Sequence, residues 1–142
     1  MESSVKITHK GNMQFEGDVN GHKITLDTAA DKGGSDQGPR PKPFMLLALA
    51  GCTGMDVISI LRKMRVEWDE FTVEVQADQT NEHPKYYHKM HVVYGFKGED
   101  LPVDKLKKAV DLSEERYCGV SAVYKQVIDM TAEIQVNGNK VS

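Results

Sequence analysis

Apolar and polar residues alternate over short stretches at the start of the chain. The segments "NMQFEGDV" and "HKITLDT" are rich in residues that suit β-strands, and Asn20-Gly21 lies between them. Asn-Gly readily adopts the positive φ angles of a tight hairpin turn, so the pattern predicts a β-hairpin. Ahead of it, Val5 and Ile7 alternate with polar neighbours, which indicates another strand.

A loop is predicted over residues 29–43, "AADKGGSDQGPRPKP", because no regular element fits its glycines, prolines and aspartates. Pro39, Pro41 and Pro43 stiffen its end and lead into a helix start, where proline is tolerated. Loops of this length in compact domains are often functional or mobile. We therefore expect the loop to be mobile and to lie near the mouth of a pocket.

A long helix is predicted over about 44–66. Its first half is apolar nearly all round, which predicts burial on every face, and its second half is amphipathic. Gly51 and Gly54 each cost a helix about 1 kcal/mol relative to alanine. They indicate that another backbone comes close or that space is kept for a ligand beside Cys52. Asp56 interrupts the apolar run, so we interpret this segment as a buried core helix rather than a membrane span.

The rest of the chain reads as strands and helices in turn. Period-two alternation predicts strands over 70–80 and 86–98, and helical spacing of Val103, Leu106 and Val110 predicts a helix. A short helix is expected from Cys118 or Gly119. A last strand is expected over 129–136, with Met130, Ala132, Ile134 and Val136 on its buried face. Runs of strands separated by helices predict an α+β fold.

The composition is that of an ordinary globular protein. The chain has 142 residues, of which 39% are hydrophobic and 27% charged, so a single domain over 1–142 is expected. The net charge of −3 and the lack of a basic run make nucleic acid and membranes poor partners. The first residues do not resemble a signal peptide, so a cytoplasmic location with reduced cysteines is expected.

The histidines do not predict a metal site. His88 and His91 lie three apart on a predicted strand and therefore face opposite sides of the sheet. The remaining histidines are scattered: His9, His22 and His83. The sequence has no glycine-rich phosphate-binding motif, and we expect neither a metal nor a cofactor.

The two cysteines are the candidate chemistry, and each has an alternative. Cys52 fits either a small buried apolar residue or a reactive thiol in the central helix. Cys118 precedes a predicted helix start, where the helix dipole lowers the pKa of a thiol, although Glu114 and Glu115 act against this.

Taken together, "GPRPKPFMLLALAGCTGMDVISILRK" and, further on, "RYCGVSAVYKQV" resemble the OsmC/Ohr superfamily of osmotically inducible and organic hydroperoxide resistance proteins. The resemblance covers nearly the whole chain, and "GC…DVISIL" looks closest to the YhfA-like branch. It implies a long central helix wrapped by antiparallel sheets in an intertwined homodimer. It also implies that Cys52 attacks a hydroperoxide, that Cys118 captures the resulting sulfenic acid as a disulfide, and that a dithiol reductant restores both thiols.

Two departures from the family pattern concern charge. Family peroxidases carry a glutamate in the loop before the first cysteine, where this chain has Lys42, and an arginine from the N-terminal strands, which the matching "GNMQFEGDV" lacks. Arg40, Lys42 and Arg116 are the nearest substitutes, although a solvated surface charge explains each of them as well. Arg40 and Arg116 are our candidate substrate-binding residues.

Two functions from different classes follow from the resemblance. The first is a thiol-dependent reductase of organic hydroperoxides in oxidative-stress defence. The second is a non-catalytic dimer of the same fold that binds a small lipophilic ligand. Retention of both cysteines favours the enzyme, and the missing glutamate and arginine favour the binding protein.

Overall fold

The computed structural model describes residues 1–142, which form two compact units, Met1–Met45 and Leu46–Ser142. A single domain over the whole chain stays a prediction.

The first unit contains a three-stranded antiparallel sheet in the order β1-β2-β3. Its strands are β1 (Lys6–His9), β2 (Phe15–Val19) and β3 (His22–Leu26). Asn20 and Gly21 have φ angles of 52° and 82°, the left-handed conformation that the hairpin turn requires. The predicted hairpin and the strand before it are confirmed.

The loop after β3 contains a short helical turn and several hydrogen bonds that its sequence did not predict. A single 3-10 turn, η1 (Ala30–Lys32), lies within it, contrary to the expectation of no regular element. The buried Asp27 carboxylate accepts hydrogen bonds from the backbone N–H groups of Thr28, Ser35 and Gln37. The Gln37 N–H contributes most to lowering the pKa of Asp27. These bonds tie the loop to the end of β3; its mobility and its nearness to a pocket stay predictions.

The second unit holds a four-stranded sheet in the order β4-β5-β6-β7. Along the chain its elements are α1 (Phe44–Lys63, whose first two residues belong to the first unit), β4 (Glu70–Gln79), β5 (Tyr87–Lys97), α2 (Val103–Leu112), the π-helical turn η2 (Ser113–Tyr117), α3 (Gly119–Tyr124), β6 (Asp129–Val136) and β7 (Asn139–Lys140). The expected α+β order is confirmed. Two details differ: β6 pairs with β5 in parallel, not antiparallel, and β7 was not predicted.

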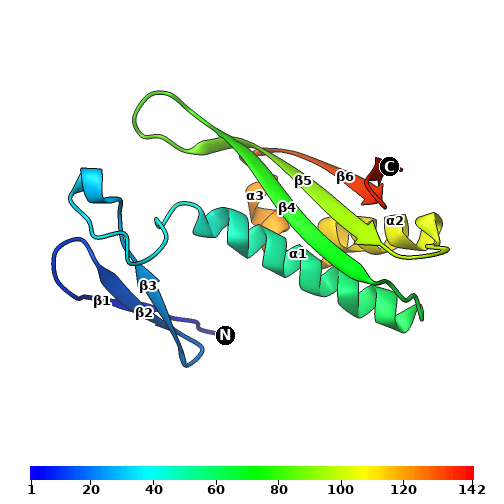
Figure 1. The fold of residues 1–142 in the computed structure, drawn as a ribbon, viewed down its shortest axis with the longest axis horizontal. Coiled ribbons are helices and arrows are strands. Elements are labelled where there is room, and N and C mark those ends of the chain that lie inside the picture. The colour runs from blue at the N-terminus through cyan, green and yellow to red at the C-terminus, as the bar shows by residue number, and fades with distance from the viewer. The chain divides into compact units, whose positions relative to one another are not determined.

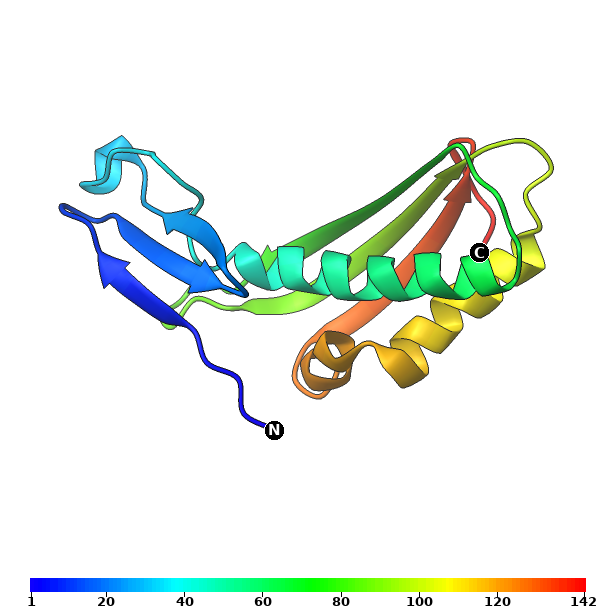
Figure 2. The same ribbon diagram turned by 90° about the horizontal axis from the view of Figure 1, so that it is seen from below.

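The helices of this unit lie on one side of its sheet (Figures 1 and 2). Alternate residues of β5 point to that side and are buried: Met90, Val92, Tyr94 and Phe96. Apolar residues of α1 and α2 are buried as well: Leu49, Val57, Leu61, Leu106 and Val110. The alternation predicted for β5 is therefore confirmed. On β6, Ile134 is buried as expected, but Ala132 is exposed.

Helix α1 is buried on one face only within the single chain. Leu47 and Met55, on its other face, are 63% and 76% exposed, so the expected burial on every face is not met by this chain alone. The helix ends at Lys63 rather than Val66, because Arg65 adopts a left-handed φ of 59°. By length and apolar content alone α1 is also able to cross a membrane, a test that core helices of soluble proteins pass as well.

Candidate functional site

The two cysteines, far apart in the sequence, come together beneath the sheet of the second unit. Cys52 lies in the middle of α1, and Cys118 is the residue that caps the start of α3. The two sulfur atoms and a carboxylate oxygen of Asp56 all lie within 4.8 Å of one another. Both cysteines are free thiols.

Local structure explains how each side chain reaches this point. Cys52 and Asp56 are four residues apart on α1 and therefore lie on the same helix face. Cys118 has an extended backbone between η2 and α3, and its N–H donates to the Ser113 carbonyl oxygen at 2.7 Å. Its sulfur then accepts a hydrogen bond from the Ser121 N–H at 3.3 Å. The π-helical turn thus redirects the chain so that the Cys118 thiol points back toward α1.

The two thiols differ in accessibility. Cys118 is only 2% exposed, whereas Cys52 is half-buried. Burial, followed by a hydrogen bond with Cys52, raises the pKa of the Cys118 thiol to about 11. The sequence indicated the opposite direction, from the helix start. The N–H groups of Ser121 and Val120 do lower this pKa, but desolvation outweighs them because α3 is only six residues long and the sulfur is buried.

A chain of buried and part-buried hydrogen bonds runs from Asp56, beside the thiols, to the sheet. Ser113 Oγ donates to Asp56 Oδ2 at 3.1 Å and lies 2.9 Å from Thr53 Oγ1. Thr53 Oγ1 is in turn 2.7 Å from the Tyr94 hydroxyl, which donates to Glu114 Oε1 at 2.9 Å. Burial raises the pKa of Glu114 and that of Tyr94. This network fixes α1, η2 and β5 against one another around the thiols.

A family model and a curated relative of similar sequence both match this chain over most of its length. The model of the family described as "OsmC-like protein" matches residues 33–133. Protein YhfA of Escherichia coli K12 is 30% identical over 118 residues, which cover 83% of this chain and 85% of YhfA.

The chain belongs to the OsmC-like family.

Solved structures agree with this assignment. A hypothetical protein from Aquifex aeolicus VF5 is similar to this OsmC-like chain with a TM-score of 0.84 and 27% identity, over 96% of this chain and 98% of that one. An organic hydroperoxide resistance protein OsmC from Legionella pneumophila has a TM-score of 0.64 at 15% identity, over 96% of each chain, and shares the fold. The predicted family and the α+β, OsmC-like fold are confirmed, including the resemblance to YhfA, and the intertwined homodimer stays a prediction.

The candidate arginines of the OsmC-like chain have partners other than the thiols. The Arg116 guanidinium lies over the Tyr117 ring, 5.6 Å from its centroid, and forms no hydrogen bond with either sulfur. Arg40 belongs to the first unit, where it donates to Asp36 Oδ1 at 2.6 Å and to the Gly38 carbonyl oxygen at 3.3 Å. Their roles in substrate binding stay predictions.

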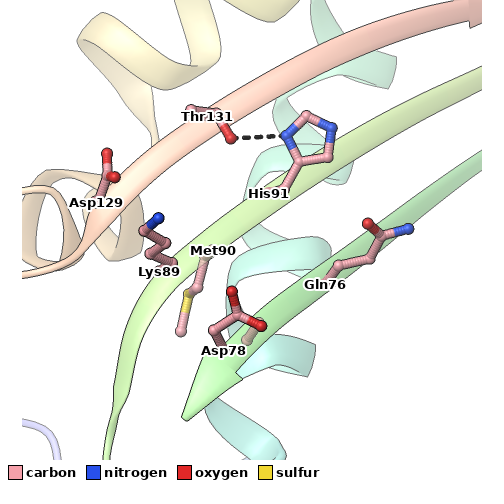
Figure 3. Close-up of a pocket in the computed structure, with 8 residues that line it drawn as sticks. Gln76, Asp78, Lys89, Met90, His91, Asp129 and Thr131 are labelled. Carbon is pink, nitrogen blue, oxygen red and sulfur yellow. Dashed lines mark hydrogen bonds between the residues drawn. The ribbon is translucent and has the colours of Figure 1, made fainter. Parts of the chain in front are cut away.

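The histidine analysis missed a cluster on the opposite face of the sheet. His91 and His88 are an odd number of residues apart on β5, so they alternate between its faces as expected. His91 Nδ1 lies 2.7 Å from Thr131 Oγ1 on β6, as Figure 3 shows, and Nε2 lies 2.8 Å from Glu133 Oε1. We call His91, Thr131 and Glu133 the outer-sheet cluster. Two of its members, His91 and Thr131, line a hollow of about 280 Å³ together with Gln76, Asp78 and Lys89.

Sequence reasoning also missed four residues around the thiols. Nothing in the sequence singled out three of them, Thr53, Tyr94 and Ser113. It marked the fourth, Asp56, only as an interruption of an apolar segment. The spacing of four residues between Cys52 and Asp56 was the available signal, because it places both side chains on one helix face.

Proposed function

We propose that this OsmC-like protein reduces organic hydroperoxides, with Cys52 as the attacking thiol and Cys118 as the resolving thiol. The observation that carries the proposal is the approach of the two sulfurs to within 4.8 Å in one chain. A similar fold in a Legionella pneumophila organic hydroperoxide resistance protein supports it. The proposed setting is oxidative-stress defence in the cytoplasm.

The chemistry balances with one external reductant. The Cys52 thiolate attacks the outer oxygen of R–O–O–H, the O–O bond breaks, and R–O⁻ takes up a proton and leaves as the alcohol. Cys52 is then a sulfenic acid. The Cys118 sulfur displaces its oxygen as water and forms the disulfide, and a dithiol reductant returns both cysteines to thiols while it is itself oxidised.

Burial supports this division of roles. Only Cys52 is partly open to solvent, so it is the sulfur that a peroxide molecule reaches first. Cys118 is 2% exposed and its pKa is raised to about 11, so at neutral pH it remains a protonated, poorly nucleophilic thiol. A sulfenic acid formed beside it is a much better electrophile than an intact peroxide held at a distance. Cys118 therefore acts second.

The active form in this proposal is a homodimer. Leu47 and Met55 on α1, and Val123 and Val127 at and after α3, are more than half exposed in the single chain. A second copy that covers these side chains removes apolar surface from water. We expect sedimentation at micromolar concentration to give a dimer; a well-folded monomer under those conditions contradicts this part of the proposal.

Arg40 and Arg116 are the proposed cations for the peroxide and the developing charge. Arg116 is two residues before Cys118. Its side chain is exposed, so it is able to leave the Tyr117 ring by a change of rotamer. If either arginine binds the substrate, Arg40→Gln or Arg116→Gln raises KM for the peroxide. Unchanged KM in both variants removes them from the site.

The direct test is peroxide consumption by thiol variants of the reduced protein. Cys52→Ser should consume no organic hydroperoxide, because the attacking sulfur is gone. Cys118→Ser should consume one equivalent and stop with Cys52 as a sulfenic acid, which dimedone traps. Serine keeps a side-chain oxygen that caps α3, so this variant preserves the Ser121 hydrogen bond. Consumption that persists in Cys52→Ser contradicts the proposal.

The second candidate function is a binding protein for a small lipophilic ligand. The observation that favours it is the electrostatic surroundings of the thiols, because the Asp56 carboxylate lies within 4.8 Å of both sulfurs and Arg116 does not hydrogen-bond to either. A thiolate is disfavoured beside carboxylates. Ligand binding without any loss of thiols in excess hydroperoxide would favour this function over the enzyme.

A further inference from the structure

Three groups at the thiol site have the chemistry of metal ligands. Cys52 and Cys118 each offer a sulfur, and Asp56 offers a carboxylate oxygen, all within 4.8 Å of one another. The ligands come from two different segments, α1 and the start of α3. This is the usual way in which a protein builds a site that exists only when it is folded.

The separations suit a single small ion. Zinc binds cysteine sulfur at about 2.3 Å and carboxylate oxygen at about 2.0–2.2 Å in a tetrahedron. Ligand atoms around such an ion are therefore roughly 3.5–3.8 Å apart. The three ligand atoms all lie within 4.8 Å of one another, about 1 Å beyond these separations at most.

Hydrogen bonds already hold two of the three ligand groups in place. Ser113 Oγ donates to Asp56 Oδ2 at 3.1 Å, and the Ser121 N–H donates to the Cys118 sulfur at 3.3 Å. Such outer partners orient ligands, and their loss from known metal sites typically costs about 10–100-fold in affinity. The two bonds leave a second oxygen of Asp56 and further lone pairs of the sulfur for an ion.

A hollow gives an ion access to the Asp56 side of this group, and Cys52 is partly open to solvent. A hollow of about 390 Å³ is lined by Asp56, Ile60, Leu112 and Tyr117, with Ser59 and Lys63 also on its wall. The Ser113 hydroxyl that donates to Asp56 and the Ser121 N–H that donates to Cys118 are both neutral groups. A divalent cation offsets two of the three negative charges that two thiolates and a carboxylate carry together.

We propose that Cys52, Asp56 and Cys118 of the reduced protein bind one Zn²⁺ ion, with its fourth position open to water or a ligand. The sulfur ligands favour zinc over magnesium or calcium, which prefer sites made of oxygen alone. Binding releases the two thiol protons to solvent. It also occupies the lone pair with which Cys52 attacks an electrophile, so zinc protects both thiols from oxidation and alkylation. The proposal does not depend on peroxide chemistry.

Cobalt is the probe for the ligand set, because its bond to thiolate gives a charge-transfer band in the ultraviolet that bonds to nitrogen and oxygen do not. Titration of the fully reduced, folded protein with Co²⁺ should produce this band and saturate at one ion per chain. Zn²⁺ should then displace the cobalt and abolish the band. Zn²⁺ should also slow the reaction of both cysteines with iodoacetamide.

Variants separate this site from adventitious binding to surface histidines. Cys52→Ser and Cys118→Ser should each weaken the band and lower Zn²⁺ affinity by at least about 10–100-fold. Asp56→Asn, which keeps the shape and an acceptor for Ser113, should lower the affinity without loss of the band's thiolate character. Asp104→Asn, the same substitution at an exposed position on α2, is the matched control and should change nothing.

The outcomes decide the proposal whether or not the protein reduces peroxides. Cobalt bound without a thiolate band places the ion elsewhere and overturns the proposal. Affinity that is unchanged in folded Asp56→Asn removes Asp56 from the ligand set and overturns the three-ligand site. Peroxide reduction that fails while the cobalt band appears contradicts only the proposed enzyme.

Discussion

The thiol site, taken together with the hydrogen-bond network of Thr53, Tyr94 and Glu114, lies on the helix side of the sheet, and the outer-sheet cluster lies on the opposite face. The two shift the pKa of a glutamate in opposite directions. Each includes a glutamate and a threonine bonded to a residue of β5: Thr53 to Tyr94 on the helix side, and Thr131 to His91 on the other. On the helix side, burial raises the pKa of Glu114. On the outer face, the hydrogen bond from His91 lowers the pKa of Glu133.

The difference shows that charged side chains are disfavoured on the helix side of the sheet and stabilised on the outer face. The outer-sheet cluster satisfies its carboxylate with an imidazole partner, so its ionised form stabilises the fold. The thiol site instead keeps a carboxyl and a thiol in surroundings that disfavour their charged forms. Groups held in this way are typical of sites kept for chemistry or binding.

The largest change in unfolding free energy that tests this contrast is expected from a threonine-to-valine substitution, made on each face of the sheet in turn. Thr53→Val removes the hydroxyl that joins Tyr94 and Ser113 in the interior, and it should cost about 1–3 kcal/mol of unfolding free energy because both partners stay buried. Thr131→Val is the control: its hydroxyl is exposed and valine suits a strand, so the change should stay within about 0.5 kcal/mol. Urea denaturation measures both. Equal losses would show that the two networks contribute alike.

A smaller effect is expected from Glu114→Gln, and its sign depends on pH. The folded pKa of Glu114 is raised, so its ionisation opposes folding. Wild-type stability should therefore fall as pH rises from 4.5, the ordinary pKa of glutamate, through the raised folded value, and the variant should lack this fall. Thermal unfolding between about pH 4 and about pH 7 measures the difference. A variant that loses stability in parallel with the wild type would contradict it.

The smallest effect is expected from Glu133→Gln and has the opposite sign. The folded pKa of Glu133 is lowered by His91, so its contribution is present above pH 4.5 and is lost as pH falls through the lowered folded value. The variant should be slightly less stable than the wild type at neutral pH and equal to it in acid. The same thermal series provides the measurement. A larger deficit in acid than at neutral pH would reverse the assigned role of the cluster.

Local chemistry made most of the secondary structure predictable. Asn20-Gly21 specifies its hairpin through two positive φ angles, and period-two alternation located β5 and its buried face. The same Asn-Gly signal recurs at Asn137-Gly138, with φ angles of 50° and 86°, and its neglect explains the missed β7. The parallel pairing of β5 with β6 depends on how the chain crosses back through α2 and α3, which no local pattern encodes.

The two cysteines of the candidate site could be predicted from the sequence, but the polar residues around them could not. Motif context singled out Cys52 and Cys118, but the buried polar pairing of Thr53 with Tyr94 and Ser113 arises only when α1, β5 and η2 pack together. The raised pKa of Cys118 could not be predicted because a helix start is visible in the sequence and the depth of burial is not.

The central claim is that Cys52 and Cys118 form one redox pair, and disulfide mapping after a single equivalent of organic hydroperoxide tests it most directly. Reduced wild-type protein is mixed with cumene hydroperoxide, and free thiols, intact mass and the linked peptides are then measured. We expect loss of both thiols, a chain lighter by two hydrogen atoms, and one peptide pair joined through Cys52 and Cys118. Two thiols that persist through excess hydroperoxide in the folded protein would contradict it.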